Sequence, residues 1–351
     1  MARFCGKIKS LSDEKAQKLR TLGIIGGGIV GKSLLFSLAC EHRQKYDRVV
    51  IFESEDFAPA CTLRTTSIVA ARGVLPGIGP LGDSIHQGIL DFKDHVKKFA
   101  PQGVYPIYQI TSAQEKMDYF LRRYKEFSHA QEFRGLAFTK ELPLYIEDAY
   151  YVNPSEYCDW LYQWSAQKMN VIHKKDFVVS IDEELNVKTH NNETFKFDHL
   201  ILAGSIKNKL WSSLVTDSKV TRSKPVKGSY LLFKNIDWGN ESYSLSMDGL
   251  NLIYRAPSHE LLIGATSDES ELYSLVEKEF LSEAYLYFSN ILQRSLPDFK
   301  KAEVFTGIRE KSSKRQPYLG TEKNVSYIGG LYKNGFTLSL KMARTLVSQL
   351  F

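Results

Sequence analysis

One segment near the N-terminus constrains the fold of this chain more than any other. The apolar run Leu22 to Ile25 leads directly into the glycine-rich turn Gly26 to Gly31, and an apolar-periodic run from Ser33 to Ala39 follows. A second apolar run, Val49 to Phe52, ends on Glu53. Strand, tight turn, helix and strand within about 30 residues make one βαβ unit, which is long enough for two parallel strands to pair across a helix.

The glycines of this turn have the spacing of a dinucleotide-binding site. Gly26 permits a tight turn, Gly28 lets the backbone approach a pyrophosphate, and Gly31 lets the helix pack close to the strand. Free N–H groups at the start of the helix (Ile29, Val30) favour an anion there. Glu53 stands 22 residues after Gly31, where a carboxylate can accept hydrogen bonds from both ribose hydroxyls of an adenosine. The competing interpretation is a glycine-rich turn that binds nothing.

A second glycine turn lies near the other end of the chain. The apolar run Val325 to Ile328 precedes a turn from Gly329 to Gly335, and an amphipathic helix is predicted from Phe336 to Leu350. NAD and FAD share the ADP half, so the first turn alone does not separate them. Donors from Asn334 to Thr337 are suited to the negative charge that a reduced isoalloxazine carries at N1 and O2. The second turn therefore favours FAD, unless it is only a connection before a helix.

The remaining pattern predicts two domains. Further helices are expected at 83–99, 112–127, 151–167 and 269–296, and further strands at 105–110, 177–181 and 200–203, the last being apolar enough to be buried on both faces. Alternating strands rich in Tyr and Phe are expected between 224 and 266. We therefore predict an α/β fold: an interrupted doubly wound, Rossmann-like FAD-binding domain (21–89, 150–222, 305–351) with an inserted antiparallel α+β substrate domain (90–149, 223–304). Residues 1–20 form an N-terminal extension.

Composition excludes several classes of protein. The four cysteines, Cys5, Cys40, Cys61 and Cys158, form no CxxC pair, so neither a disulfide framework nor a metal site is expected. There are 46 basic and 40 acidic residues, a net charge of +6, and no arginine stripe interleaved with aromatic residues, so a nucleic-acid partner is not expected. No signal peptide and no apolar run of about 18 residues is found. A soluble, cytoplasmic protein is the default, and the sequence does not define its oligomeric state.

Seven short segments occur in the order found in one enzyme superfamily. They are the glycine turn with Glu53; Thr65-Thr66-Ser67; Val152-Asn153-Pro154; Ala203-Gly204; Tyr254 to Thr266; Gly307-Ile308-Arg309 with Pro317 to Gly320; and Gly330 to Gly335. Over residues 22–351 the chain resembles the FAD-dependent oxidoreductases of the D-amino-acid oxidase superfamily. Its glycine oxidase and sarcosine oxidase branch is the most similar, together with the oxidase domain of the bifunctional tRNA wobble-uridine modification enzyme.

The resemblance implies bound FAD and transfer of a hydride from the carbon next to a substrate nitrogen to flavin N5, after which the imine hydrolyses. It implies that Arg309, after Gly307, clamps a substrate carboxylate, as the fork geometry of a guanidinium allows. Tyr254 is expected to line the substrate pocket. The other cofactor contacts that it implies are Thr65, Thr66 and Ser67, the backbone of Val178 or Val179 at the adenine, Ala203, Gly204, Gly330, and Lys333 at the flavin edge.

The chain departs from the superfamily's pattern before the Pro317 turn. An acidic residue is frequent there, whereas this chain has Lys314, Arg315 and Gln316, which suggests a more acidic substrate. No residue beside Thr65 to Ser67 demands a covalent flavin link, although Cys61 and His86 stay open as attachment points, and we expect noncovalent FAD.

Two other functions stay open at the level of sequence. One is an FAD-dependent dehydrogenase of a 2-hydroxy acid or polyol phosphate, and the other is an oxidase that modifies a tRNA wobble uridine. In the main hypothesis the substrate is an amino acid or related amine, and oxygen or another electron acceptor reoxidises the flavin.

Overall fold

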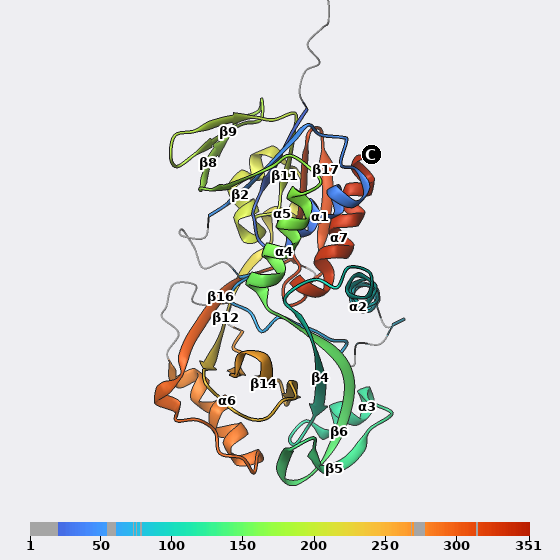
Figure 1. The fold of residues 1–351 in the computed structure, drawn as a ribbon, viewed down its shortest axis with the longest axis vertical. Coiled ribbons are helices and arrows are strands. Elements are labelled where there is room, and N and C mark those ends of the chain that lie inside the picture. The colour runs from blue at the N-terminus through green and yellow to red at the C-terminus, as the bar shows by residue number, and fades with distance from the viewer. Residues whose placement is uncertain are drawn as a thin grey trace, which may run out of the picture.

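A computed structural model of the chain describes residues 20–54, 61–72, 74, 76–77, 79–267, 269, 278–313 and 315–351. It has two halves, each built on a large sheet (Figure 1). Residues 1–19 of the predicted N-terminal extension lie outside the described residues, as does most of the segment 268–277, where the sequence predicted the start of a helix.

The first half is built on a six-stranded sheet of order β17-β18-β11-β1-β2-β7. Its strands are β1 (Thr21–Ile25), β2 (Arg48–Glu53), β7 (Val171–Lys175), β11 (His199–Leu202), β17 (Tyr318–Glu322) and β18 (Val325–Gly329). All neighbours are parallel except β17 and β18, which are antiparallel. Strands from the start, middle and end of the chain therefore share one sheet, as the sequence predicted.

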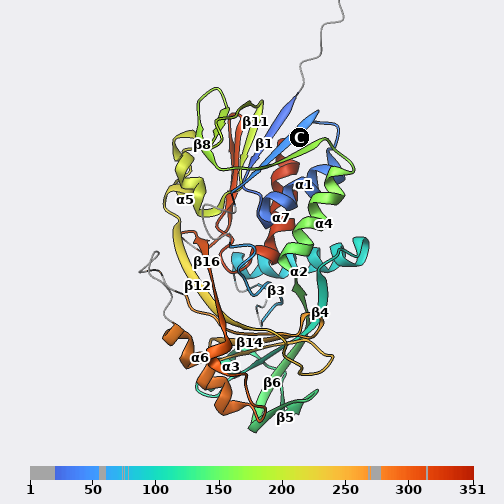
Figure 2. The same cartoon turned by 60° about the vertical axis from the view of Figure 1, so that its left-hand side comes forward.

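Both faces of this sheet are covered. On one face, leucines of α1 (Ile29–Glu41) and apolar residues of α7 (Gly335–Leu350) pack on β1, β2, β11 and β18, and α4 (Pro154–Ala166) lies beside α1 (Figure 2). On the other face lie the small sheet β8 (Val178–Ile181), β9 (Asn186–Thr189) and β10 (Thr194–Lys196), the 3-10 segment Ser205–Leu214 and α5 (Ser218–Thr221). Burial on both faces explains the continuously apolar β1 and β11.

The second half is built on a larger, mostly antiparallel sheet of order β16-β12-β15-β14-β13-β4-β6-β3, with β5 paired to β6. The strands are β3 (Ile68–Val69), β4 (Val104–Ser112), β5 (Ser128–Phe133), β6 (Leu136–Val152), β12 (Lys224–Phe233), β13 (Tyr243–Met247), β14 (Leu250–Arg255), β15 (Glu260–Gly264) and β16 (Glu303–Lys311). Only β4 and β13 pair in parallel. Helix α6 (Lys278–Ile291) packs on this sheet, and α3 (Met117–Arg123) and short 3-10 turns at Ala256–Ser258 and Phe299–Lys301 complete it.

The predicted domain boundaries need correction in three places. Those at 89/90, 149/150 and 304/305 fall inside α2 (Pro80–Phe99), β6 and β16. Helix α2 packs as a whole in the first half, where Phe92 lies in one core with α1, α4 and α7. Strands β6, β12 and β16 run from one half towards the other (Figures 1 and 2). At two of these places, in β6 and β16, the halves are therefore joined by a continuous strand.

The helix predicted at 112–127 is also wrong in extent. Strand β4 continues to Ser112, and the Asp248 carboxylate accepts hydrogen bonds from the backbone N–H groups of Gln114, Glu115 and Lys116. These donors are therefore held in a turn, and the helix is confined to Met117–Arg123.

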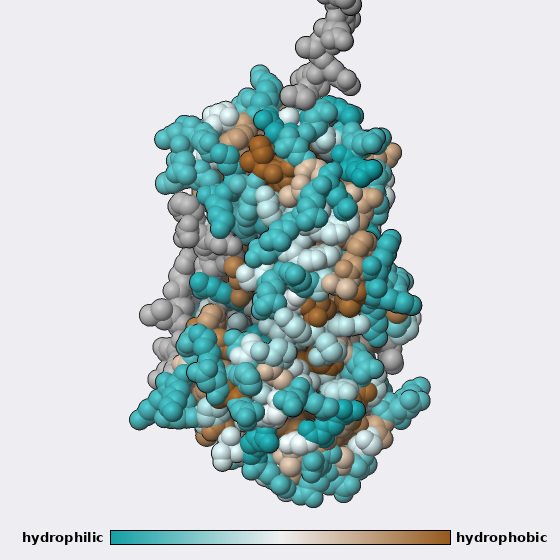
Figure 3. Space-filling model, viewed as in Figure 1, coloured by the Kyte–Doolittle hydropathy of each residue, from teal (hydrophilic) through white to brown (hydrophobic). Residues whose placement is uncertain are grey.

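No helix among the described residues is long and apolar enough to cross a membrane. The face shown in Figure 3 is covered mainly by hydrophilic side chains, with small apolar patches between them.

Candidate active site

The two glycine turns meet at one cavity of about 700 Å³, which is within the usual size of small-molecule sites. A Cβ built on Gly335 would lie 3.8 Å from Cγ2 of Ile29, so the starts of α7 and α1 adjoin. The cavity brings together most residues that the sequence singled out. Those that line it are Gly26, Gly28, Ile29, Val30, Glu53, Thr65, Thr66, Ser67, Ala203, Gly204, Arg309, Gly330, Lys333, Asn334, Gly335, Phe336 and Thr337.

The first glycine turn leaves no room for side chains. Gly26 has φ +117°, and a Cβ there would lie 2.5 Å from the carbonyl oxygen of Ala203. A Cβ on Gly31 would lie 2.0 Å from the carbonyl oxygen of Gly26. Gly31 does not line the cavity, but it sets how closely α1 approaches the turn. The start of α1, with the positive end of its dipole, therefore faces the cavity, where the Thr62 hydroxyl is the side-chain group that accepts from the N–H of Ile29.

Glu53 is held at this end of the cavity by two partners. Its Oε2 atom lies 2.8 Å from Nε2 of His173 and 3.3 Å from Nζ of the buried Lys32. Burial would raise the pKa of Glu53, but the His173 hydrogen bond and the Lys32 charge hold it below its usual value. Glu53 is therefore an anionic hydrogen-bond acceptor, suited to ribose hydroxyls.

A buried carboxyl group, that of Glu310, holds the second glycine turn in place. Oε2 of Glu310 accepts a 2.8 Å hydrogen bond from the N–H of Gly330, which has φ +71°, and Oε1 accepts one of 2.5 Å from the Tyr318 hydroxyl. Burial raises the pKa of Glu310 despite these hydrogen bonds. The first turn of α7, from Gly335 to Thr337, lines the cavity, so its N–H end points a second helix dipole at the site.

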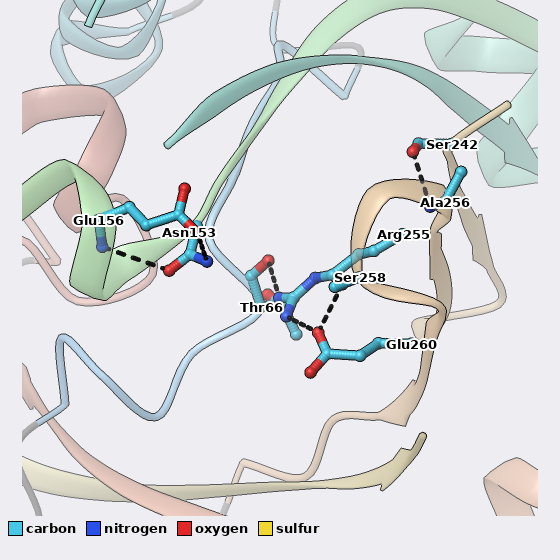
Figure 4. Close-up of polar contacts among 8 residues, drawn as sticks. All are labelled: Thr66, Asn153, Glu156, Ser242, Arg255, Ala256, Ser258 and Glu260. Carbon is cyan, nitrogen blue, oxygen red and sulfur yellow. Dashed lines mark hydrogen bonds and ion pairs between the residues drawn. The ribbon is translucent and has the colours of Figure 1, made fainter. Parts of the chain in front are cut away.

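The segment Thr65 to Ser67 is held by the second half of the molecule. Arg255, from the end of β14, donates a 3.3 Å hydrogen bond to the carbonyl oxygen of Thr66 and pairs with Glu260 at 3.2 Å (Figure 4). Its guanidinium carbon lies 4.0 Å from the ring centroid of Tyr151. A side chain of the large sheet thus fixes one wall of the cavity.

Figure 4 also shows the predicted helix start at Val152-Asn153-Pro154. The Asn153 side chain accepts from the backbone N–H of Glu156 and donates to its carboxylate at 2.8 Å, which caps α4.

Arg309 lies on β16 with its side chain at the cavity. One terminal nitrogen donates to the carbonyl oxygens of Thr266 (3.0 Å) and Lys227 (3.4 Å). The guanidinium packs over Gly228, where a Cβ would lie 2.1 Å from it, and its carbon lies 5.4 Å from the ring centroid of Tyr332. Its Nε–H is buried against the Gly228 backbone, and its other terminal nitrogen makes no hydrogen bond within the described residues. Arg309 is therefore oriented by the protein, and that second terminal nitrogen keeps donor capacity for a ligand.

Four other predicted residues do not line the cavity. Tyr254 is wrongly predicted: it is fully buried in the core of the large sheet, and its hydroxyl donates to the Gly239 carbonyl and accepts from the Trp238 N–H. Val178 is buried against the first sheet and Val179 is half exposed, and neither lines the described cavity, so the expected contact of their backbone with adenine stays a prediction. Gly307 lies behind the wall, against the Arg64 backbone.

Sequence reasoning missed several residues that line the cavity. Thr62 accepts a 3.1 Å hydrogen bond from the N–H of Ile29, and the Lys207 ammonium reaches Ser54 at 2.9 Å. Tyr332 and Arg72 complete the opposite end. Tyr332 lies within the motif segment Gly330 to Gly335 but was not singled out there. Thr62, Lys207 and Arg72 belong to none of the seven segments.

These features define a class of protein: a dinucleotide-binding enzyme fold whose cavity runs from an adenosine-type acceptor at Glu53 to an oriented guanidinium at Arg309. The chain belongs to the FAD dependent oxidoreductase family (DAO), whose pattern matches residues 21–349. It is an FAD-dependent oxidoreductase, as the sequence predicted. None of the curated proteins matches it.

Solved structures share the fold at low sequence identity. Glycine oxidase from Geobacillus kaustophilus is 20% identical, covers 94% of both chains and has a TM-score of 0.74. Iminodiacetate oxidase from Chelativorans sp. BNC1 is 17% identical over 94% of this chain and 95% of its own, also with a TM-score of 0.74. FAD-bound L-alpha-glycerophosphate oxidase from Mycoplasma pneumoniae is 16% identical, covers 95% of both and has the same TM-score.

Proposed function

We propose that the protein oxidises an amino acid or a related amine. Arg309 carries this proposal, because one terminal nitrogen of its guanidinium is held by two backbone carbonyls at one end of the cavity while the other makes no hydrogen bond within the described residues. A substrate carboxylate would complete its hydrogen bonding and fix the adjacent C–H and C–N bonds. Glycine oxidase and iminodiacetate oxidase among the similar structures support an amine substrate.

The residues of both glycine turns would hold the cofactor. The turn at Gly26 and Gly28, with the N–H group of Val30 beside that of Ile29, which donates to Thr62, fits the pyrophosphate, and Glu53 fits the adenosine ribose. The flavin ring would lie between Arg309 and the start of α7 at Gly335 to Thr337. Bound FAD supplies the acceptor for the hydride that leaves the carbon next to nitrogen, and oxygen or another acceptor then takes the electrons.

The thiol of Cys61 argues for noncovalent FAD. Cys61 lines the cavity, but burial raises the pKa of its thiol to about 11, although the Arg309 charge opposes this. At neutral pH the thiol is therefore protonated and a poor nucleophile. His86, on α2, is not among the described residues that line the cavity. We infer that neither residue attaches the flavin.

Oxidation of a hydroxy acid or polyol phosphate is the second candidate. The cationic residues of the cavity and the glycerophosphate oxidase likeness favour it. However, oxidation of a hydroxyl requires a base that accepts its proton, whereas a neutral amine reacts without one. No histidine lines the described part of the cavity, and both oxygens of Glu310 are engaged. Lys333, whose pKa is lowered chiefly by burial, is the base that this alternative would need.

Anaerobic titration of the holoprotein tests the proposal. Flavin absorption is followed while glycine, sarcosine, proline, aspartate, glutamate or iminodiacetate is added, and separately lactate, 2-hydroxyglutarate or glycerol 3-phosphate. We expect at least one amine to bleach the flavin, with an imine-derived carbonyl product in equal amount. Bleaching by a hydroxy acid or by glycerol 3-phosphate, and by no amine, would overturn the proposal in favour of the second candidate.

A further inference from the structure

Positive charge is concentrated at the Arg309 end of the cavity. Arg309, Lys333, Arg72 and Arg315 all line it. The Tyr332 ring contacts two of them: its centroid lies 5.4 Å from the guanidinium carbon of Arg309 and 5.5 Å from the ammonium nitrogen of Lys333. Both charges therefore lie close to one aromatic ring at the same end of the cavity.

The three arginines are close enough to Lys333 to affect its protonation. Burial lowers the pKa of Lys333, and the charges of Arg309, Arg72 and Arg315 lower it further, while Tyr332 opposes them. Mutual repulsion of this kind is relieved when an anion binds among the cations.

The described carboxylates near these cations have other partners, including Glu269, which pairs with Lys311 although the charge of Arg315 also helps to lower its pKa. Glu310 uses its two oxygens for Tyr318 and Gly330, and Glu53 lies at the other glycine turn with Lys32 and His173. Glu147 accepts from the backbone N–H of Arg72 and lies near its charge, but burial raises the pKa of Glu147. Within the described chain, no ion pair involves Arg309, Arg315, Lys333 or Arg72.

The charges of the expected reactants do not balance these cations. An amino acid with the neutral amine that reacts brings one negative charge, and a reduced flavin brings another, which is fewer than the four cations. We propose that the substrate carries a second anionic group, a carboxylate or a phosphate, which binds at Lys333 with Arg72 and Arg315 while Arg309 holds the first carboxylate. This inference deepens the proposed function. That the substrate is an amine rests on the proposed function, whereas the second anionic group is inferred from the cations of the cavity alone.

Unreactive ligands test the charge separately from the chemistry. The holoprotein is titrated at low salt with butyrate, succinate and 3-phosphonopropionate, and binding is read from the change in flavin absorption. Succinate adds a second carboxylate and 3-phosphonopropionate a phosphonate, which separates the two sources of the anion. None of the three carries an amine or hydroxyl to oxidise, so the result stands even if no amine is turned over. We expect one of the dianions to bind at least tenfold more tightly than butyrate.

Three variants locate the second anion. Lys333→Met should reduce the dianion preference to threefold or less while butyrate affinity changes less than twofold, and Lys333→Arg should keep the preference. Lys323→Met, in the turn after β17 and away from the cavity, is the control for loss of one charge and should change neither. If Lys333→Met purifies without flavin, Arg315→Gln replaces it with the same expectation.

Two results would overturn the inference. One is butyrate binding to the unmodified protein as tightly as both dianions. The other is an equal loss for all three ligands in Lys333→Met, because Lys333 would then serve the flavin or the first carboxylate.

Discussion

At the scale of single residues, the proposed substrate binding depends on the guanidinium group of Arg309. Replacing it in Arg309→Met removes the charged donors while keeping an unbranched chain over Gly228. Hydrogen bonds to charged groups contribute about 1.5–3 kcal/mol, so we expect butyrate and succinate to bind about 10- to 100-fold more weakly. The measurement is the same flavin titration, with FAD content checked first.

Lys311→Met is the matched control for Arg309→Met. Lys311 lies two residues further along β16. Its side chain forms an ion pair with Glu269 and does not line the described cavity. Unchanged ligand affinity in Arg309→Met, or an equal loss in Lys311→Met, would contradict the assigned role.

His95 should make folding sensitive to acid. It is buried among Phe36, Phe99 and Trp160, neither ring nitrogen has a described partner, and burial lowers its pKa to about 3. The unfolded chain binds a proton near pH 6.5 and the folded one does not, so His95 destabilises the fold as pH falls from 6.5 towards 3. As the pH is lowered, the free energy of unfolding should decrease in both proteins. The decrease per pH unit should be smaller in His95→Phe than in the unmodified holoprotein, by up to about 1.4 kcal/mol.

Denaturant unfolding at pH 7 and pH 5 measures this difference. His199, buried with a pKa lowered to about 4, remains in both proteins, so only part of the acid sensitivity should disappear. The same pH dependence in both proteins would contradict the assignment to His95.

Single residues were predictable where spacing determines their neighbours. The glycine spacing and Glu53 followed from the βαβ unit. Tyr254 did not, because strand alternation shows which residues share a face but not which face meets the cavity, and its face packs into the core. Thr62 and Arg72 reach the cavity only through loops whose path the sequence pattern does not define.

At the scale of elements, Gly31 sets the approach of α1 to the glycine turn. A methyl group there would lie 2.0 Å from the Gly26 carbonyl oxygen, so Gly31→Ala must push the helix away from the strand. We expect the holoprotein to lose most of its FAD and about 1–3 kcal/mol of stability. The measurements are FAD content and denaturant unfolding.

Gly79→Ala is the control for Gly31→Ala. Gly79 precedes α2 in an extended conformation, and a Cβ there would meet no atom of the described residues within 4 Å. Normal FAD content in Gly31→Ala would show that the close approach is not needed.

The strength of a local signal determined which elements could be predicted. The strands and helices of the βαβ unit and of the C-terminal turn lie within a few residues of their predicted positions. The long strand β6 was not foreseen, because Pro143 and charged residues interrupt its alternation. The helix at 112–127 was extended too far, since its N-terminal part is held in a turn by Asp248, which is distant in sequence.

At the scale of the whole molecule, Arg255 connects the large sheet to the cavity wall. Arg255→Met should free the Thr66 carbonyl and loosen the segment Thr65 to Ser67. Because the buried pair with Glu260 is lost as well, we expect FAD to bind about tenfold more weakly. The measurement is FAD release on dilution.

Arg134→Met is matched to Arg255→Met, since Arg134 also pairs with a glutamate, Glu241, and lies 4.4 Å from the Tyr108 ring. The ion pair of Arg134 with Glu241 is exposed, and neither residue lines the described cavity. Arg134→Met should therefore leave the affinity for FAD unchanged. Equal effects of the two variants would show that Arg255 has no special role in the wall.

The fold as a whole was predictable because each half repeats its own signal. Apolar runs in three separated parts of the chain belong to one parallel sheet, and alternating strands belong to the other. The domain boundaries could not be predicted, because α2, β6 and β16 each continue through the point where the sequence pattern changes.

A crystal structure of the holoprotein tests the central claim most directly, that both glycine turns grip one FAD. We predict the pyrophosphate at Gly26 to Ile29, the ribose at Glu53, and the flavin ring between Gly335 to Thr337 and the Arg309 guanidinium. A flavin ring outside the reach of Arg309, or FAD bound at only one of the two turns, would contradict this account.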